Sequence, residues 1–148
     1  MTESIVLPLI DEHERRIDAD REQVWHALGR MLSGSDSTFT AIAMRLLGAR
    51  PGRATGDPLR EGSTLPGFAV SRAVRPGVVC LEGRHRFSRY ALTFRLRSDG
   101  DSTIVTAESR GEFPGMTGRA YRALVVGSGG HVIAVRRMLA RISAEAAR

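Results

Sequence analysis

The stretch that decides the fold is MTGRAYRALVVGSGGHVIAVRRMLARISAEA, residues 116–146. Counted from Leu124, steps of three and four residues along a helix reach an apolar or small series: Ala120, Gly127, His131, Val135, Met138 and Ile142. The arginines of this stretch fall mostly on the opposite side or the flanks. The pattern predicts one helix of roughly thirty residues, which would be about 45 Å long. A helix of that length is expected to lie across a whole sheet.

The sheet is predicted from residues 65–112, where the period changes to two. Turns are expected at Arg75 to Gly77, between Gly83 and Ser88, and at the Asp99-Gly100 pair, which is typical of a hairpin. An antiparallel sheet with one apolar and one charged face needs a cover on the apolar face only. The predicted inner-face residues are Phe68, Val70, Val74, Val79, Leu81, Tyr90, Leu92, Phe94, Leu96, Val105, Ala107 and Ser109.

The first third of the chain predicts a loosely ordered lead-in over residues 1–10, an edge strand over 11–17 and two short helices. Asp20 and Gln23 resemble a capping box at the start of the first helix, residues 20–32. A second apolar stripe runs from Phe39 to Leu47 and stops at Gly48. Residues 49–63 hold three glycines and two prolines, and they are expected to form either the lid of a binding site or a surface connection that hides a short strand.

Length and composition predict a single domain over residues 1–148, since 42% hydrophobic and 26% charged residues are ordinary for a globular protein. The longest early apolar run, residues 5–10, is too short for a membrane span and lacks the basic flank of a signal peptide. We therefore expect a cytoplasmic protein without membrane insertion. The single cysteine, Cys80, excludes an internal disulfide and a multi-cysteine zinc site, and its place among Val78, Val79 and Leu81 predicts a small core residue.

All 22 basic residues are arginine, so chemistry through a lysine Schiff base is excluded. The net charge of +6 suits acidic partners, but the arginines are scattered and few aromatic residues separate them, so nucleic-acid binding is not expected. On the outer face of the sheet, acidic residues can offset arginines on neighbouring strands. These charged residues are Glu82, Glu108, Glu112, Arg84, Arg95, Arg97 and Arg110.

Three segments resemble the START-like helix-grip superfamily, also called SRPBCC or polyketide cyclase/dehydrase and lipid-transport proteins. They are IDADREQVW at residues 17–25, which is similar to the family's junction of first strand and first helix, LPGF at 65–68, and RYALTFRL at 89–96. The order of elements is similar as well, from about Asp11 onward. The resemblance implies an α+β fold in which a curved antiparallel sheet wraps around a long C-terminal helix, with two short helices after the first strand.

The resemblance also implies a cavity between the sheet and the terminal helix. Small residues on both sides are compatible with a cavity, because Ala107, Ser109 and the run from Gly127 to Gly130 take up little volume. The alternatives are that these residues let helix and sheet approach closely, or that the glycines kink the helix. The predicted ligand-binding residues are Trp25, Phe68, Val70, Leu81, Tyr90, Phe94, Ala107, Leu124, Gly127 and His131.

His131, near the centre of the apolar stripe, is the strongest single candidate for a functional residue. It is either a general acid or base, a hydrogen-bonding group for a ligand, or a satisfied core histidine. Tyr90 is its expected partner, since a buried hydroxyl needs a hydrogen bond. The direction of His85 is left open by its position in a turn. The four histidines lack the spacing of a zinc site, and no metal or cofactor is expected.

Three functions follow as hypotheses. The first is binding of a small hydrophobic molecule, lipid-like or aromatic and polyketide-like, in the cavity. The second is a cyclase- or dehydrase-like enzyme that uses His131, with Tyr90, for proton transfer while the cavity holds a reactive chain. The third is a protein-interaction domain that works through the arginine-rich outer face around Arg84 and Arg86.

Overall fold

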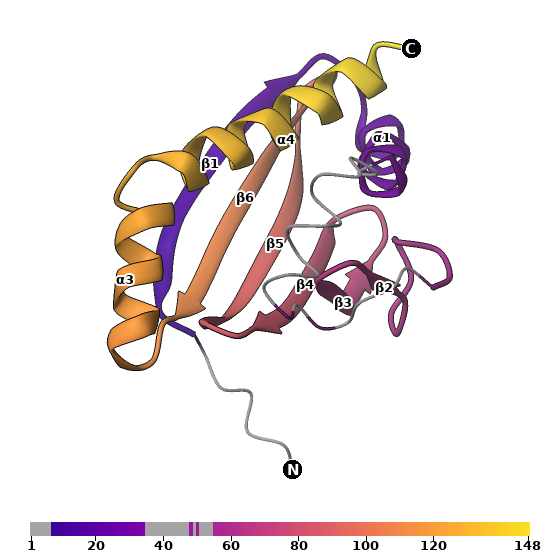
Figure 1. Ribbon diagram of the computed structural model, residues 1–148. Helices are drawn as coiled ribbons and strands as arrows, with labels where there is room; N and C mark the ends of the chain where they lie inside the picture. The colour runs from indigo at the N-terminus through magenta and orange to yellow at the C-terminus, as the bar shows by residue number, and fades with distance from the viewer. Residues whose placement is uncertain (1–6, 35–47, 49, 51–54) are drawn as a thin grey trace.

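A computed structural model describes residues 7–34, 48, 50 and 55–148. Six antiparallel strands form one sheet in the order β1-β6-β5-β4-β3-β2. Figure 1 shows α4 lying across one face of the curved sheet, with α3 at the β1 side and α1 near the C-terminal end of α4. The elements are β1 Leu9–Ile17, α1 Arg21–Ser33, β2 Thr64–Leu65, β3 Phe68–Val74, β4 Val78–His85, β5 Ser88–Asp99, β6 Ser102–Glu112, α3 Gly115–Val125 and α4 Gly130–Ala146. The second predicted helix, 39–47, lies outside the described residues.

The predicted edge strand is confirmed, since β1 lies at the end of the sheet and pairs with β6. It begins at Leu9, two residues before the predicted start. A β-bulge between Leu9 and Asp11 interrupts the alternation of the strand and hides its beginning in the sequence. The pairing reaches further still, because the Gly111 N–H donates to the Pro8 carbonyl at 2.9 Å.

The capping box at α1 is confirmed. The Gln23 N–H donates to the Asp20 carboxylate at 2.8 Å, and the Gln23 side chain accepts from the Asp20 N–H at 3.1 Å. At its other end α1 meets the C-terminal end of α4, where Arg30 Nε lies 3.2 Å from a Glu145 carboxylate oxygen. The cap and this contact fix α1 against one end of α4.

The strands and hairpins predicted between residues 65 and 112 are confirmed. Strand β3 ends at Val74, directly before the predicted turn at Arg75 to Gly77. Gly100 adopts a φ of 61° in the turn between β5 and β6, a conformation that favours glycine. In the described part of residues 49–63, β-pairing is limited to two isolated bridges, Arg50 with Arg84 and Thr55 with Thr64. The expected lid role of this stretch stays a prediction.

The prediction of one continuous C-terminal helix is wrong, and the alternative that the glycines kink it is confirmed. Helices α3 and α4 are bent by 57° at the break between them. Gly129 has a φ of 81°, and a Cβ added at Gly127 would lie 2.6 Å from the Ala123 carbonyl oxygen. Both positions therefore favour glycine. The break ends the apolar stripe, and the Leu124 side chain is 72% exposed.

The hydrophobic core occupies one half of the inner face of the sheet. Helix α1 and the C-terminal part of α4 cover this half, and Phe94 of β5 has no exposed surface there. The other half lies beneath α3 and the first turns of α4. The largest fully buried side chains are Phe94, Leu28, Leu81, Ile142, Val24, Val70, Val79, Val105, Val135 and Thr103.

Candidate functional site

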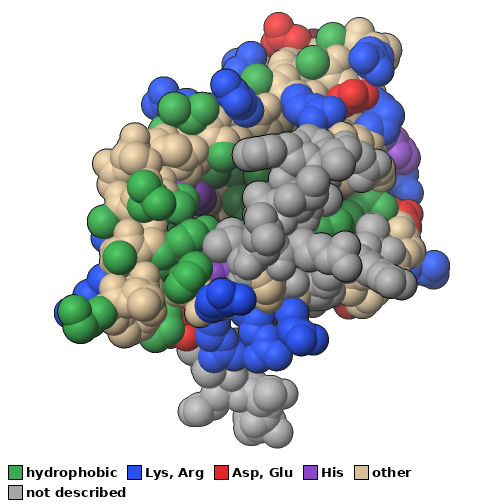
Figure 2. All heavy atoms as spheres, viewed as in Figure 1, with side chains coloured by type: hydrophobic (Ala, Val, Ile, Leu, Met, Phe, Trp, Pro, Cys, Tyr) green, Lys and Arg blue, Asp and Glu red, His purple; other side chains and the backbone are tan. Residues whose placement is uncertain are grey.

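A cavity of about 240 Å³ lies between the inner face of the sheet, α3 and the first turns of α4. Figure 2 views this face and shows apolar side chains, in green, and histidine side chains, in purple, gathered between α3 and the sheet. Most of the walls are apolar or aromatic, which is usual for a site that holds a small molecule. The apolar walls include Ile10, Leu92, Phe113, Val125, Val135 and Met138.

Of the predicted ligand-binding residues, Tyr90 and His131 line this cavity. Phe68 is half-buried, and its ring meets the Tyr90 ring edge-on at 5.2 Å between centroids. Leu124 is exposed and Gly127 lies in the helix break, so neither lines the cavity. The alternation of the strands predicts the inner face correctly except at Val74, which is 47% exposed because a register shift between Val70 and Arg72 turns Ala73 to the core instead. Alternation also does not show which half of that face the helices fill. The remaining predicted residues lie in the packed core: Trp25, Val70, Leu81, Phe94 and Ala107.

His131 contacts a carboxylate that the sequence analysis did not select. Its Nε2 lies 3.2 Å from one oxygen of Asp11, and the other oxygen of Asp11 lies 3.2 Å from Nε2 of His13. The expected pair of His131 with Tyr90 is not formed, because the Tyr90 hydroxyl donates to the Gly67 carbonyl at 2.6 Å. All three side chains of the His131–Asp11–His13 group are largely shielded from solvent.

The β-bulge in β1 places Ile10 in the cavity wall next to Asp11, which lies on the inner face by its regular alternation with His13 and Ile17. Ile10 lines the cavity, and the next residue, Asp11, contacts His131 beside it. A regular strand would direct consecutive side chains to opposite faces, whereas a bulge re-aims one of them. The only sequence signal was the pair of Asp11 and His13 two residues apart on a predicted edge strand. That signal was assigned to edge protection.

Ser109 supplies an unused polar group in the cavity wall. The residue is 3% exposed, and its hydroxyl has no hydrogen-bond partner among the described residues. A buried hydroxyl left without a partner costs about 1–3 kcal/mol, so such groups are uncommon in folded proteins. Ser109 also pairs with Asp11 across β1 and β6, which places the hydroxyl at the His131 end of the cavity.

An aromatic cluster closes the opposite end of the cavity, where β4 and β5 join. The His85 ring lies 4.7 Å from the Tyr121 ring and 5.4 Å from the Tyr90 ring, measured between centroids, so His85 points to the inner face. The Phe87 N–H donates to His85 Nδ1 at 3.0 Å, which leaves the ring hydrogen on Nε2 for the Ser88 hydroxyl at 3.0 Å. Nδ1 can accept the Phe87 N–H only in the neutral ring, and burial lowers the pKa of His85, which disfavours the charged form as well.

Solved structures share this architecture. The Mll3558 protein from Rhizobium loti superposes with a TM-score of 0.58 at 19% identity, covering 91% of this chain and 94% of that one. CalU16 from Micromonospora echinospora gives 0.53 at 20% identity, covering 91% and 81%. A truncated norcoclaurine synthase from Thalictrum flavum gives 0.58 at 12% identity, covering 93% and 92%. No protein-family model matches the chain, and no curated protein matches its sequence.

The open antiparallel sheet, the long last helix and these superpositions agree with the resemblance found in the sequence. The chain has the START-like helix-grip fold. At identities of 12–20% the superpositions establish the fold alone. The function of this helix-grip domain must therefore be argued from its own cavity.

The stability of the protein is expected to fall at alkaline pH as Tyr90, in the cavity wall, loses its proton. Burial, with Tyr121 nearby, raises the pKa of Tyr90 to about 12, whereas an unfolded tyrosine has a pKa of about 10. The folded state thus holds the proton more tightly. The resulting stabilisation is fully present below about pH 10 and is lost as the pH rises toward about 12.

The measurement is urea unfolding of the wild type and of Tyr90→Phe across that pH range. Below about pH 10 the variant should be less stable by about 1 kcal/mol, because it lacks the hydrogen bond to Gly67. The difference should shrink as the pH approaches about 12. A difference that stays constant with pH would contradict the raised pKa.

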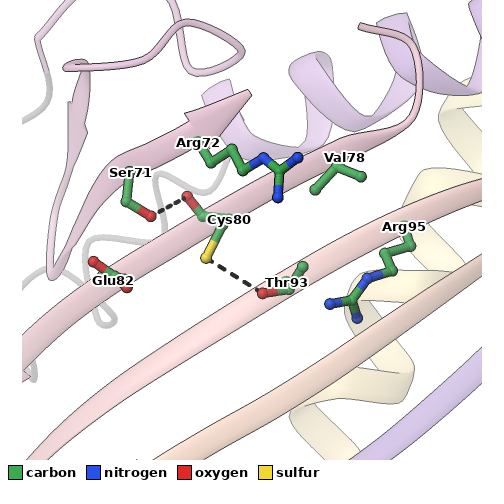
Figure 3. Close-up of a pocket in the computed structure, with 7 residues that line it drawn as sticks. All are labelled: Ser71, Arg72, Val78, Cys80, Glu82, Thr93 and Arg95. Carbon is green, nitrogen blue, oxygen red and sulfur yellow. Dashed lines mark hydrogen bonds between the residues drawn. The ribbon is translucent and has the colours of Figure 1, made fainter. Parts of the chain in front are cut away.

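A second hollow, of about 390 Å³, lies on the outer face of β3, β4 and β5. Figure 3 shows Ser71 and Thr93 directed at Cys80, with Arg72 and Arg95 on the Val78 side of this group. The Ser71 hydroxyl donates to the Cys80 carbonyl at 3.3 Å, and the Thr93 hydroxyl contacts its sulfur at 3.3 Å. These polar groups satisfy one another, so this hollow makes a weaker ligand site than the inner cavity. Cys80 is half-buried on the outer face, and its predicted place in the core is wrong.

On the outer face, Glu108 of β6 pairs with Arg95 across the strands, as expected, and with Arg110 along its own strand. Glu108 lies 3.2 Å from Arg95 and 2.7 Å from Arg110, and these arginines lower the pKa of its carboxyl, the hydrogen bond from Arg110 having the largest effect. Arg84 and Arg86 are exposed on β4 and in the turn after it. That this face binds another protein stays a prediction. If it does, reversing the charge of these two arginines should abolish partner binding.

In residues 7–34, 48, 50 and 55–148, no group of three or more histidine, cysteine or acidic side chains is arranged to hold a metal ion. Within the same ranges no single helix is long and apolar enough to cross a membrane. Only α3 and α4 taken together reach that length and composition, and they are sharply bent.

Proposed function

We propose that this helix-grip domain binds a small, largely apolar molecule in the cavity between β5, β6 and the bend of α3 and α4. The single observation that carries the proposal is the cavity itself, about 240 Å³ in volume and walled mainly by apolar and aromatic side chains. A dry apolar cavity of about 150 Å³ accommodates benzene. The present volume therefore suits an aromatic ligand of one or two rings better than a long lipid chain.

A second candidate is a cyclase- or dehydrase-like enzyme, and the contact between His131 and Asp11 favours it. A histidine oriented by a carboxylate at the wall of an apolar cavity is suited to general acid–base chemistry. If this reading is right, His131→Ala removes the pH dependence of the reaction while ligand affinity is retained. Equal loss of affinity and rate would favour simple binding.

Blocking the cavity tests the binding proposal. Ala134 of α4 is exposed and borders the cavity, so the indole of Ala134→Trp can fill its mouth without disturbing the core. Naphthalene and 2-naphthol are the probes. At a concentration of 100 times Kd, either probe should stabilise the wild type by about 2.7 kcal/mol and Ala134→Trp by much less.

The matched control is Ala140→Trp, which adds the same indole to an exposed alanine of α4 away from the cavity. This variant should respond to the probes like the wild type. Mass spectrometry of the organic extract from gently purified protein would identify a natural ligand that co-purifies with it. Equal stabilisation of both variants would show that the probes bind elsewhere and would contradict the proposal.

A further inference from the structure

We propose that the ligand of this cavity carries a weakly acidic hydroxyl, a phenol or an enol, which binds between Ser109 and His131 and passes its proton to His131. The inference rests on the proposed binding function and adds the chemical class of the ligand. Two independent features of the cavity carry it. One is a buried hydroxyl without a partner, and the other is a histidine with one nitrogen engaged.

Ser109 indicates a polar atom on the ligand. Its hydroxyl is buried in a wall that is otherwise largely apolar, and no described residue satisfies it. A purely hydrocarbon ligand would leave this hydroxyl without a hydrogen bond. A ligand oxygen placed against it would accept the hydroxyl hydrogen, and that oxygen must lie at the end of the cavity where β1 and β6 pair.

His131 indicates that this oxygen carries a proton. The contact between Nε2 and the Asp11 carboxylate places the ring hydrogen on Nε2 when the imidazole is neutral. The Nδ1 lone pair is then the acceptor, and Nδ1 has no hydrogen-bond partner in the part of the chain that the structure describes. A neutral imidazole with a free lone pair accepts a hydrogen bond from an O–H group.

The two groups lie close enough to share one ligand atom. Asp11 and Ser109 are directly paired across the antiparallel strands, where the Cβ atoms of such pairs lie roughly 4.5–5.5 Å apart. His131 contacts Asp11 and lines the same cavity as Ser109. A single oxygen atom can therefore meet both the Ser109 hydroxyl and the His131 ring.

The proton transfer is balanced within this group. The ligand O–H bond breaks, the proton joins His131 Nδ1, and the electron pair stays on the ligand oxygen, which accepts the Ser109 hydrogen. The Asp11 carboxylate stabilises the imidazolium that forms. No redox partner or metal takes part. Because the ligand enters neutral, the transfer creates one negative charge on the ligand oxygen and one positive charge on the neighbouring His131 ring.

Other charged and titratable groups around the cavity do not compete for this role. Arg110 is engaged by Glu108 at 2.7 Å and by the Leu7 carbonyl at 3.0 Å, which disfavours a ligand carboxylate that would need a free cation. His85 is held neutral at the far end, and Tyr90 donates to Gly67. The titratable and charged groups that face the cavity or His131 are Asp11, His13, His85, Tyr90, Arg110 and Tyr121.

The test compares p-nitrophenol with p-nitrotoluene, which has a similar shape but no acidic hydroxyl. Wild-type protein should bind p-nitrophenol about fivefold to tenfold more tightly. The bound phenol should ionise with an apparent pKa lower by roughly one unit than the free probe, seen as a gain of phenolate absorbance when protein is added about one pH unit below the pKa of free p-nitrophenol. Ser109→Ala should remove most of the difference in affinity between the two probes and leave p-nitrotoluene binding unchanged.

Two variants separate proton transfer from packing. His131→Gln keeps an amide near Asp11 but has no titratable nitrogen, so it should lose the phenolate signal and weaken p-nitrophenol binding far more than p-nitrotoluene binding. Asp11→Asn tests Asp11 as a positioning residue, and it should weaken the same signal without affecting p-nitrotoluene. A merely structural role for either residue would change the binding of both probes alike.

The outcomes distinguish the two proposals. If both probes bind equally, Ala134→Trp blocks both, and the phenol stays protonated, the hydroxyl inference is overturned and the binding function stands. If neither probe binds, or if Ala134→Trp leaves both unaffected, both proposals are overturned. Tighter binding of p-nitrophenol with a phenolate signal that requires His131 supports the inference.

Discussion

Replacing Phe94 by alanine should lower the free energy of unfolding by about 3–5 kcal/mol, the usual cost of removing a buried aromatic side chain. Phe94 has no exposed surface, and it is the largest of the fully buried side chains. Its neighbour across the strand pair is Ala107, which is too small to fill the space left behind. Urea unfolding followed by circular dichroism measures the loss.

The control for Phe94→Ala is Leu124→Ala, which shortens a side chain that is 72% exposed. Its effect should stay within about 0.5 kcal/mol. The comparison also decides where the ligand lies, because Phe94 was among the residues predicted to bind it. A Phe94→Ala protein of unchanged stability that fails to bind naphthalene would place the ligand in the core region and contradict the assignment of the cavity.

Sequence patterns predicted those features of this fold that depend on neighbouring residues. The two-residue period of β5, the capping box of Asp20 and the Asp99-Gly100 turn are local signals, and the structure confirms each. The break after α3 could not be predicted from the neighbouring residues alone. A Gly-Ser-Gly-Gly run is compatible with a close helix approach or with a kink, and the two differ only in tertiary packing.

The candidate site was less predictable because it depends on non-local geometry. Alternation placed Tyr90 and Phe94 on one face, yet α1 and the end of α4 bury Phe94, whereas Tyr90 lies beyond them at the cavity. Asp11 was missed because its partner, His131, lies 120 residues away in the sequence, and only the packing of α4 over β1 brings the two side chains together. Superposition at 12–20% identity establishes the path of the chain and does not establish such side-chain contacts.

A methyl group added at Gly83 should be the most damaging small substitution in the cavity region. A Cβ there would lie 1.9 Å from the Gly67 carbonyl oxygen and 2.7 Å from Cε2 of Tyr90. The nearest atom belongs to the backbone, so it cannot rotate away as a flexible side chain would. Overpacking of this kind costs about 1–3 kcal/mol, and displacement of the Tyr90 hydroxyl from Gly67 adds a lost hydrogen bond, so we expect about 3 kcal/mol for Gly83→Ala.

The matched control is Gly77→Ala in the turn between β3 and β4, where the nearest atom to an added Cβ, the Val74 oxygen, lies 3.7 Å away. This variant should fall within about 0.5 kcal/mol of the wild type. In folded Gly83→Ala protein, naphthalene binding should weaken as well, because Tyr90 forms part of the cavity wall. If Gly83→Ala matched the control in stability and binding, the close contact of β4 with Gly67 would be wrong. The Tyr90 anchor would then have no part in shaping the cavity.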